Sequence, residues 1–378
     1  MIPRIYKPLI SKSFFLFGPR ATGKSTWVKE KYPKAIVIDL LESETYLRLS
    51  AQPSRIREFF LDAVEWIFVD EIQRIPELLN EIHHHIEKNK KVKFILTGSS
   101  ARKLRRGAVN LLAGRAYQTN FYPLTIWELG KDFNLTHALK FGLLPSVWNS
   151  GEDPKKYLSS YVYTYLREEV QAEGLTRTLE VFSRFLESIS FSQAQTLNMS
   201  TVARDVGIDS KLVANYIEIL EDLLLAKRLR CFTKKAKRKM ALHSKFFFFD
   251  CGVFRTLRPI GPLDSESELN GPSLETIFLN HHQVWVEANG LKQELFYWRT
   301  QSKIEVDFVS YGEAGFFAFE VKSSDRVRAE DLEGLRLFLK DYPQAKAYFL
   351  YGGKRKYRDE GIEIIPFVEG IEILRSLG

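Results

Sequence analysis

Eight residues near the start of the chain have the types and the spacing that hold a polyphosphate. They run Gly18-Pro19-Arg20-Ala21-Thr22-Gly23-Lys24-Ser25 and fit the pattern G-x-x-x-x-G-K-S. The glycines let backbone N–H groups turn toward phosphate oxygens, Lys24 adds a positive charge for the β- and γ-phosphates, and the Ser25 hydroxyl is a ligand for Mg²⁺. An apolar run precedes the loop and a helical pattern continues from Thr26, so a helix N-terminus adds partial positive charge. The sequence therefore predicts a site for a nucleoside triphosphate, ATP, with Mg²⁺.

Acidic and hydroxyl residues that follow later strands suit the same site. Asp70 and Glu71 come directly after the apolar residues 66–69. Asp70 is expected to hold the Mg²⁺ shell and Glu71 to polarise the attacking water, and the alternative for Glu71 is a solvated strand end. The next strand ends in Thr-Gly-Ser-Ser at 97–100, where Ser99 is expected either to sense the γ-phosphate or to form part of a turn.

Two arginines are candidates for roles at this site. Arg115 precedes the fifth predicted strand, and it is either an arginine finger, in an assembly of several copies, or a partner in a structural ion pair. Arg20 within the loop is a candidate for contact with phosphate or with a neighbouring subunit.

The elements that must position these residues alternate between strand and helix patterns over about the first 125 residues, which predicts a parallel α/β sheet. The strands read as nearly continuous apolar runs, typical of strands covered on both faces. They are residues 14–17, 35–39, 66–69, 93–97 and 116–121. We therefore expect residues 1–135 to form an ATPase domain.

A second group of charged residues lies in the last third of the chain: Glu275, Asp307, Glu320 and Lys322. Side chains alternate along a strand, so Glu320 and Lys322 share a face that Asp307 reaches from the neighbouring strand. An acid followed about a dozen residues later by Glu-x-Lys is the spacing of PD-(D/E)xK nucleases. Asp307 and Glu320 are expected to ligate Mg²⁺, with Glu275 completing the site and Lys322 orienting the water. The alternatives are an exposed charged sheet face and an inactive nuclease-like domain that clamps DNA.

The residues around Glu275 predict a helix after a linker. Residues 259–272 are rich in proline and glycine, and Ser273 is the expected N-cap of a helix through about residue 287, with Glu275 in its first turn. His281 and His282 on this helix are predicted to be surface residues. The run His83-His84-His85 is predicted to be a helix surface, because consecutive helical positions point in different directions and cannot chelate one ion.

Between the two sites the pattern is helical and then basic. Residues 136–198 read as a helical connector, and 199–258 as a winged helix, with one helix ending at Gly207 and the next carrying Lys211 and Asn215 toward DNA. Residues 226–245 hold nine Lys or Arg and no acid, flanked by strand-like runs at 229–232 and 246–249, which predicts a basic hairpin for phosphate contacts. The alternatives are a solvated loop and a wing that docks on the ATPase domain.

Composition sets the broad class. The chain has 378 residues, a net charge of +8 and two cysteines, so no disulfide framework or cysteine-based zinc site is expected. No apolar run approaches the roughly 20 residues of a membrane span, and no signal peptide is recognised. These features predict a cytoplasmic protein, and the excess of basic over acidic residues is compatible with binding to nucleic acid.

With these motifs in hand, the chain resembles a prokaryotic family of AAA-class ATPases fused to a C-terminal domain of unknown function. The resemblance implies an AAA-type core, a winged helix at 199–258 and a restriction-endonuclease-like domain at 272–378. Where the family often has Arg-Asp, this chain has Arg167-Glu168-Glu169. The matching segments are 18–25, 68–73, 96–100, 113–115, 122–124, 142–145, 161–167 and 245–252.

The whole sequence thus favours an Mg²⁺-dependent ATPase that binds DNA through a winged helix and carries a candidate nuclease domain. One alternative is a non-cleaving, ATP-dependent DNA-binding switch. Another is a signalling ATPase in which the basic wing holds a resting state and the nuclease-like domain is inactive.

Overall fold

The computed structural model describes residues 2–377 apart from 61–63, 100–103, 105–111, 113, 150, 152, 167–178 and 241–242. The chain divides into two compact units, residues 1–124 with 219–225 and residues 125–218 with 226–378. Ser100, Ala113 and the Arg167-Glu168-Glu169 segment lie outside the described residues, so the expectations for them stay predictions. Among the helices within the described ranges, none combines the length and the apolar character of a membrane span.

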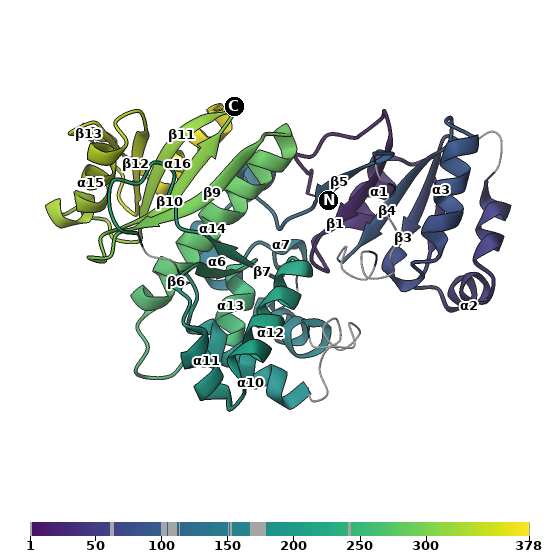
Figure 1. Ribbon diagram of the computed structural model, residues 1–378, viewed down its shortest axis with the longest axis horizontal. Coiled ribbons are helices and arrows are strands. Elements are labelled where there is room, and N and C mark those ends of the chain that lie inside the picture. Colours follow the sequence, from purple (N-terminus) through teal and green to yellow (C-terminus); the bar gives the residue numbers. More distant parts are fainter. Residues whose placement is uncertain are drawn as a thin grey trace. The chain divides into compact units, whose positions relative to one another are not determined.

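The first unit is built on a five-stranded sheet, as predicted (Figure 1). All neighbouring strands pair in parallel, in the order β2-β3-β4-β1-β5. Because β4 lies beside β1, the residues that end β4 lie next to the loop that follows β1. The strands are β1 Ser13–Phe17, β2 Ile36–Asp39, β3 Trp66–Asp70, β4 Lys93–Gly98 and β5 Ala116–Asn120.

Helices and short 3-10 turns connect these strands. They are α1 Lys24–Lys31, α2 Ser43–Ala51, η1 Pro53–Phe59, η2 Ile72–Arg74 and α3 Leu78–Lys88. The amphipathic α3 turns Leu78, Leu79 and Ile82 to the core. The histidine run lies on its other positions: His84 is exposed, but His85 is half-buried against the rings of Phe60 and Phe94. The prediction of a plain helix surface is therefore wrong for His85, whose pKa is lowered by burial and by the neighbouring His84.

The second unit begins with helices and a three-stranded sheet. The helices are α5 Ile126–Leu129, α6 Leu135–Phe141, α7 Pro145–Asn149, α8 Pro154–Ser160, α10 Leu179–Ser190, α11 Met199–Val206, α12 Ser210–Asp222 and α13 Cys251–Leu257, with short helical turns at η3 Gly130–Asp132 and η4 Tyr161–Leu166. The residues of α12 from 219 on belong to the first unit. The sheet has the order β6-β8-β7, formed by Gln195–Thr196, Lys245–Phe248 and Ala226–Leu229. The predicted helix-turn-helix pattern is present: α11 ends at Gly207 in the left-handed region, and Asp209 Oδ1 accepts from the first N–H groups of α12.

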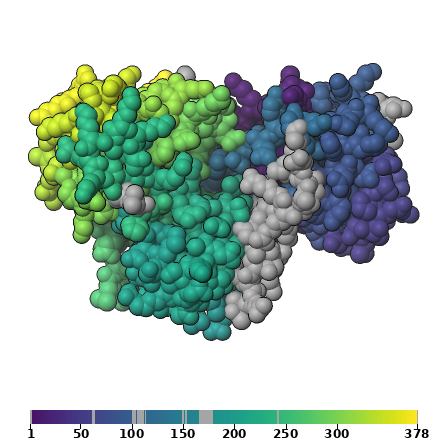
Figure 2. Space-filling model, viewed as in Figure 1, coloured from purple at the N-terminus to yellow at the C-terminus, as the bar shows by residue number. Residues whose placement is uncertain are grey.

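The basic segment between β7 and β8 is not a free hairpin. Strand β7 ends at Leu229, and Phe232 is buried in the core of the C-terminal sheet instead. The backbone of residues 230–239 runs beside β9, with Phe232 N donating to Tyr297 O at 2.7 Å and Gln301 N to Lys239 O at 3.1 Å. The prediction of a wing tip is corrected here, because Phe232 gains a buried aromatic environment that a solvent-exposed hairpin lacks. The segment lies across the C-terminal domain in the space-filling view (Figure 2).

The C-terminal domain is a six-stranded mixed sheet with helices. Its order is β13-β14-β12-β11-β10-β9, with β11, β12 and β14 parallel and the other pairs antiparallel. Helices α14 and α16 pack against each other, and α15 packs on β10 and β11 (Figure 1). The elements are α14 Glu266–Asn289, β9 Gln293–Arg299, β10 Glu305–Gly312, β11 Gly315–Lys322, η5 Ala329–Leu332, α15 Glu333–Asp341, β12 Lys346–Tyr351, β13 Tyr357–Asp359, β14 Ile362–Pro366 and α16 Phe367–Ser376.

Helix α14 is longer than the sequence suggests. It begins at Glu266 with Ser265 as N-cap, and Pro272 lies inside it. The predicted N-cap Ser273 is buried within the helix, where its hydroxyl donates to Leu269 O at 2.8 Å. The predicted linker at 259–272 therefore ends earlier, and Glu275 lies in the third turn of the helix instead of the first. Buried apolar residues from Leu269 onward stabilise the helix across its proline.

Candidate functional site

The phosphate-binding loop follows β1 and leads into α1, as predicted. Gly23 is the N-cap of α1 with φ 92°, and the first turn of α1 contains no acidic residue. At Gly18 an added Cβ would meet Phe121 O at 2.2 Å, so only glycine fits there. Lys24 is buried, and its ammonium group donates to Gly18 O at 2.7 Å and Pro19 O at 3.1 Å. The loop thus holds its lysine against its own carbonyls, beside a helix N-terminus that is open to an anion.

The carboxylates and hydroxyls predicted for this site lie at the ends of neighbouring strands. Thr97 Oγ1 on β4 donates to Asp70 Oδ1 at the end of β3. Glu71 adopts left-handed backbone with φ 59°, and its N–H donates to the same Thr97 hydroxyl at 3.4 Å. Gln73 joins two predicted residues, since its amide donates to the Glu71 carboxylate and to Ser99 Oγ at 3.2 Å. The structure therefore brings Asp70, Glu71 and Ser99 into one polar network, as their positions at strand ends require.

Sequence reasoning missed two residues that hold this region together. Gln73 ends the segment 68–73 that carries the family resemblance, but its position after an acidic pair indicates no role by itself. Arg4 lies outside every motif, yet its guanidinium donates to Thr22 O of the loop and to Tyr122 O, both at 2.6 Å, and stacks over the Phe121 ring. It connects the phosphate-binding loop to the segment after β5.

Arg115 lies at the opposite edge of the sheet from the loop. Strand β5 pairs in parallel with β1, so that Ser13 lies opposite Ala116 and Phe17 opposite Asn120. Because Arg115 precedes β5 while the loop follows Phe17, the arginine cannot reach the nucleotide site of its own chain. Its guanidinium forms an ion pair with Glu87 instead. Arg20 is half-buried within the loop.

The residues of the loop and of β3 fit a Mg²⁺–nucleotide complex. Ser25 lies in the first turn of α1, directly after the loop lysine, and Asp70 ends the strand two places away in the sheet. These would hold the ion, which when bound neutralises charge on the β- and γ-phosphates.

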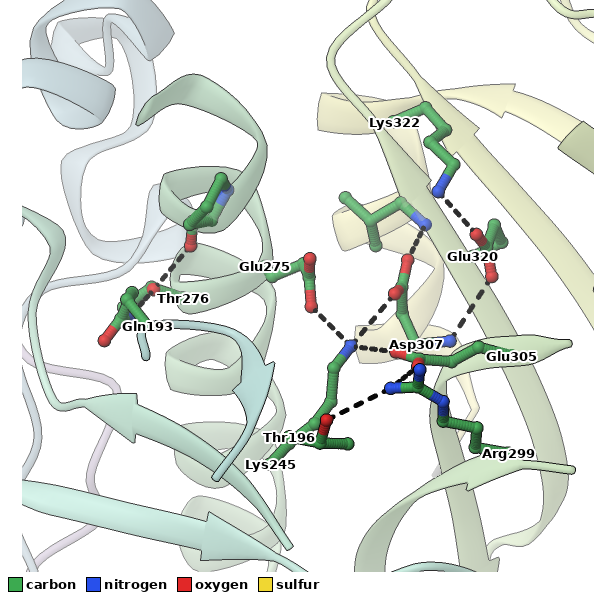
Figure 3. A network of polar contacts seen from close by, with 12 residues as sticks. Gln193, Thr196, Lys245, Glu275, Thr276, Arg299, Glu305, Asp307, Glu320 and Lys322 are labelled. Atoms are coloured by element: carbon green, nitrogen blue, oxygen red, sulfur yellow. Dashed lines mark hydrogen bonds and ion pairs between the residues drawn. The ribbon is translucent and has the colours of Figure 1, made fainter. Parts of the chain in front are cut away.

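The predicted C-terminal site residues also converge, around a lysine that sequence reasoning did not place there (Figure 3). Lys245 on β8 has a side chain only 3% exposed. Its ammonium group lies 3.0 Å from Glu275 Oε2, 2.7 Å from Glu305 Oε1 and 3.1 Å from Asp307 Oδ1. In the sequence Lys245 ends a basic stretch and begins the matching segment 245–252, and neither pattern indicates that it meets the acids of the C-terminal domain.

The remaining members of the predicted nuclease pattern lie beside this lysine. Strands β10 and β11 pair with Phe308 opposite Phe319, which brings Asp307 next to Glu320. Asp307 N donates to Glu320 Oε2 at 3.3 Å, and Val321 N donates to Asp307 Oδ2 at 3.0 Å. Lys322 lies 2.7 Å from Glu320, as expected for alternate residues of one strand.

The electrostatics follow from burial and from the two ammonium groups. Burial and the Asp307 carboxylate raise the pKa of Glu275 to about 8, and the same two causes raise the pKa of Glu320 to about 8. Asp307 behaves in the opposite way: burial opposes its ionisation, but Lys245 and Lys322 hold its pKa below the ordinary value. Burial would lower the pKa of Lys245, yet the three carboxylates raise it well above normal. Lys245 is therefore charged, and Asp307 is its ionised counterion.

This arrangement does not fit the predicted Mg²⁺ site. Within the described part of the chain, no group of three or more His, Cys, Asp or Glu side chains is arranged to hold a metal ion. Two of the three predicted ligands, Glu275 and Asp307, instead bind the ammonium group of Lys245, which lies where a shared cation would lie. The prediction that Glu275, Asp307 and Glu320 together ligate a metal is corrected on this ground.

The two histidines of α14 are not surface residues. His281 is fully buried and His282 is 2% exposed. His281 Nδ1 lies 2.7 Å from Ile277 O and so must donate, while Ile126 N donates to Nε2 at 2.8 Å, which fixes a neutral ring. Burial lowers the pKa of His281 to about 4 and that of His282 to about 3. Both are core residues that pack α14 against its surroundings.

Comparison with known families divides the chain into three parts. Residues 11–130 match an AAA domain, residues 133–264 a domain of unknown function (DUF8612), and residues 270–369 a domain of unknown function (DUF4143). The matches support an AAA-type ATPase with two fused domains of unknown function. The AAA match covers the phosphate-binding loop and all five strands of the first sheet, so nucleotide binding is supported from two directions.

Three relatives are described as uncharacterized proteins. The uncharacterized proteins Rv2008c of Mycobacterium tuberculosis and Mb2031c of Mycobacterium bovis are each 24% identical over 296 residues, covering 77% of this chain and 66% of the relative. An uncharacterized protein of Haemophilus influenzae is 21% identical over 207 residues, 50% of this chain and 52% of the relative. The alignments thus span less than two thirds of the relatives' length. Among solved structures, protein VC1899 from Vibrio cholerae covers 96% of both chains at 13% identity, with a TM-score of 0.23, too low to compare the folds.

Proposed function

We propose that the protein is a Mg²⁺-dependent ATPase whose nucleotide state controls its C-terminal domains. The observation that carries this proposal is the loop geometry: a buried Lys24 held on the carbonyls of Gly18 and Pro19, at a helix N-terminus without acidic residues. On binding, the ammonium group exchanges these two carbonyls for β- and γ-phosphate oxygens, which are the stronger acceptors.

The neighbouring groups support hydrolysis as well as binding. Ser25 and Asp70 would hold Mg²⁺, and Glu71 would orient the attacking water and accept its proton. Gln73 contacts both Glu71 and Ser99, so a γ-phosphate that engages Ser99 would also influence the carboxylate. Purified protein should hydrolyse ATP with Mg²⁺, and Glu71→Gln should keep ATP binding while losing turnover. Loss of binding in that variant would instead assign Glu71 a structural role.

Arg115 could act only on a second copy of the chain, because it lies at the far edge of its own sheet. The ion pair with Glu87 supports the structural alternative. If Arg115 acts on the nucleotide site of a second copy, Arg115→Ala lowers ATP turnover more at high protein concentration than at low. If Arg115 only forms a structural ion pair, the loss of ATP turnover is independent of protein concentration.

DNA binding through residues 199–258 remains part of the proposal. Helices α11 and α12 and the three-stranded sheet support a winged-helix arrangement, and Lys211 is exposed at the start of α12. The basic segment is docked through its backbone, yet its cations at 234–239 stay exposed. Neutralising all five should weaken DNA binding and flatten its salt dependence, and an unchanged affinity and slope would remove the claim. The five are Lys234, Lys235, Lys237, Arg238 and Lys239.

For the C-terminal domain, one observation favours the non-cleaving candidate over an active nuclease. The ammonium group of Lys245 binds Asp307, one of the two expected metal ligands, and Glu275, which would complete the metal site. The test is incubation of the purified protein with plasmid and Mg²⁺ or Mn²⁺, with and without ATP. An intact plasmid in every condition agrees with the non-cleaving domain, whereas cleavage that is lost in Lys322→Ala would establish the nuclease.

A further inference from the structure

The carboxylate cluster of the C-terminal domain holds a cation supplied by another part of the chain. An ammonium group has three N–H donors, and Lys245 has three carboxylate oxygens within 3.1 Å, one each from Glu275, Glu305 and Asp307. Donors and acceptors therefore match in number. At 3% exposure of the Lys245 side chain, water has little access to replace any of them.

This contact joins two parts of the chain that match different families. Lys245 belongs to β8, within the 133–264 match, while Glu275 on α14 and the two β10 acids belong to the 270–369 match. Two further polar contacts run in parallel (Figure 3): Arg299 Nη1 bonds Thr196 Oγ1 at 3.1 Å, and Gln193 Nε2 bonds Thr276 Oγ1 at 2.6 Å. The three-stranded sheet is thus tied to α14 and to the strands of the C-terminal sheet.

We propose that Glu275, Glu305 and Asp307 form a binding site for a primary ammonium group, and that Lys245 of the same chain fills this site. We call the three acids together with Lys245 the Lys245 latch. The latch fastens the sheet β6-β8-β7 to the C-terminal domain. It also excludes divalent cations, because a metal ion and the ammonium group cannot share the same carboxylate oxygens. The inference does not depend on ATP hydrolysis, and it gives the acidic residues a role without a metal.

The latch predicts that a divalent metal ion leaves the melting temperature of the wild type unchanged but raises that of a variant without the ammonium group. Lys245→Met keeps the length of the side chain but removes the direct ion-pair partner of the buried Glu275 and Asp307, which is strongly destabilising, whereas Glu305 keeps its ion pair with Arg299 at 3.3 Å. We expect its melting temperature to fall by roughly 10 °C. Mn²⁺ should restore part of this loss, because the uncompensated carboxylates then bind the ion.

The experiment is thermal unfolding of the full chain without nucleotide, with and without Mn²⁺. Wild type and the exposed control Lys346→Met should show the same melting temperature and no Mn²⁺ shift. The Mn²⁺ rescue of Lys245→Met should vanish in Lys245→Met/Asp307→Asn. If Lys245→Met does not fold, Glu305→Gln removes one of the three acceptors and should lower the melting temperature by a smaller amount.

Two results would overturn the inference. One is an Asp307-dependent stabilisation of the wild type by Mn²⁺, which would make the cluster a metal site despite Lys245. The other is a Lys245→Met protein that melts like the wild type and ignores Mn²⁺. Because nucleotide is absent throughout, neither result bears on the proposed ATPase activity.

A second, independent inference concerns a groove at the C-terminal ends of β11 and β12. It has a volume of about 1010 Å³ and is lined by the loops 325–327 and 352–357. The loops approach closely: Gly352 N donates to Ser324 O at 2.9 Å, and an added Cβ at Gly353 would lie 2.8 Å from Asp325 O. The Tyr351 hydroxyl donates to Arg355 O and accepts from Arg355 N, so the second loop is held in shape.

The groove carries an excess of positive charge and an exposed ring. Four cations line it against one acid, Asp325, and none of the four forms an ion pair with any residue that the structure describes. Tyr357 at its end is 45% exposed. Cations along an open groove with an aromatic ring beside them suit a single strand of nucleic acid, whose phosphates take the charge and whose bases stack. The cations are Arg326, Lys354, Arg355 and Lys356.

We infer that this groove binds the phosphate backbone of single-stranded nucleic acid. The test is fluorescence anisotropy with a labelled oligonucleotide, on full-length wild type, on Lys354→Ala/Lys356→Ala and on the matched pair Lys235→Ala/Lys237→Ala from the basic segment. The groove variant should bind about tenfold more weakly, with the slope of its salt dependence reduced by about 1.4 for the two lysines. Tyr357→Ala should weaken binding without changing the slope.

Other outcomes would contradict the groove. If only the matched pair loses affinity, the basic segment is the binding surface and the groove is not. If inorganic triphosphate displaces the oligonucleotide completely at micromolar concentration, the groove selects a free polyphosphate instead of a strand.

Discussion

The buried histidines of α14 make the protein sensitive to acid in a way that can be measured one residue at a time. His281 is held neutral by a bond from Nδ1 to Ile277 O and a bond from Ile126 N to Nε2. Protonation would place a second N–H against the Ile126 N–H at a fully buried position. The folded state therefore resists the proton, and burial lowers the pKa of His281 from 6.5 to about 4.

The sign and size of the effect follow from linkage. Between pH 6.5 and 4 the unfolded chain binds the proton and the folded protein does not, so the contribution of His281 to stability is present at neutral pH and lost as the pH falls. From pH 7.5 to pH 5 the loss is about 2 kcal/mol. His282, with its pKa lowered to about 3, should lose about the same amount over this range.

Other groups in the domain titrate in the same range, so the quantity to measure is the stability gap between wild type and variant. His281→Gln should be less stable than wild type at pH 7.5, and the gap should narrow by about 2 kcal/mol at pH 5. Urea unfolding at both pH values measures this, followed by tryptophan fluorescence because the Trp285 ring lies 5.3 Å from that of His282. The exposed His84→Gln is the control. A gap of equal size at both pH values would refute the argument that His281 is neutral in the folded state.

Two further substitutions test close contacts. Gly142→Ala would bring a Cβ within 2.0 Å of Asp250 Oδ1 at a positive φ of 78°. In urea unfolding it should therefore lower the stability of the protein by more than about 2 kcal/mol. The control Gly207→Ala also has a positive φ but meets no atom within 4 Å, so it should cost only about 1 kcal/mol. Equal losses would show that the Asp250 contact is unimportant. Arg4→Ala removes the three hydrogen bonds by which the guanidinium connects the loop to the segment after β5, and calorimetry should find ATP binding weakened about tenfold. Unchanged affinity would mean that the loop keeps its shape without Arg4.

The parts of the fold that sequence could predict are those with local signals. Apolar runs predict the five strands of the first sheet, and Gly207 predicts the end of α11. The sequence predicts the N-cap of α14 eight residues too late, at Ser273 instead of Ser265, because Pro272 and the neighbouring Gly271 signal a break. Tertiary burial of residues from Leu269 onward overrides that local signal.

In the candidate sites, too, the residues with a local sequence signal are predictable and the others are not. The members of the phosphate-binding loop and Asp70 were predictable because their spacing is fixed by a strand, a loop and a helix. Lys245 was not, because it lies 30 residues before Glu275 and 62 before Asp307, and no local pattern distinguishes it from its basic neighbours. The sequence predicts His281 and His282 to be surface residues, yet each finds a hydrogen-bond partner inside the core.

The central claim is that the amino-terminal loop binds and hydrolyses ATP through Lys24. The most direct test is Mg²⁺-dependent phosphate release by the full chain, compared between wild type, Lys24→Ala and Lys29→Ala, which changes an exposed lysine of the same helix. We predict turnover in wild type and in Lys29→Ala, and a loss of at least about 100-fold in Lys24→Ala. Equal turnover in wild type and Lys24→Ala, or no nucleotide binding by wild type, would contradict the account.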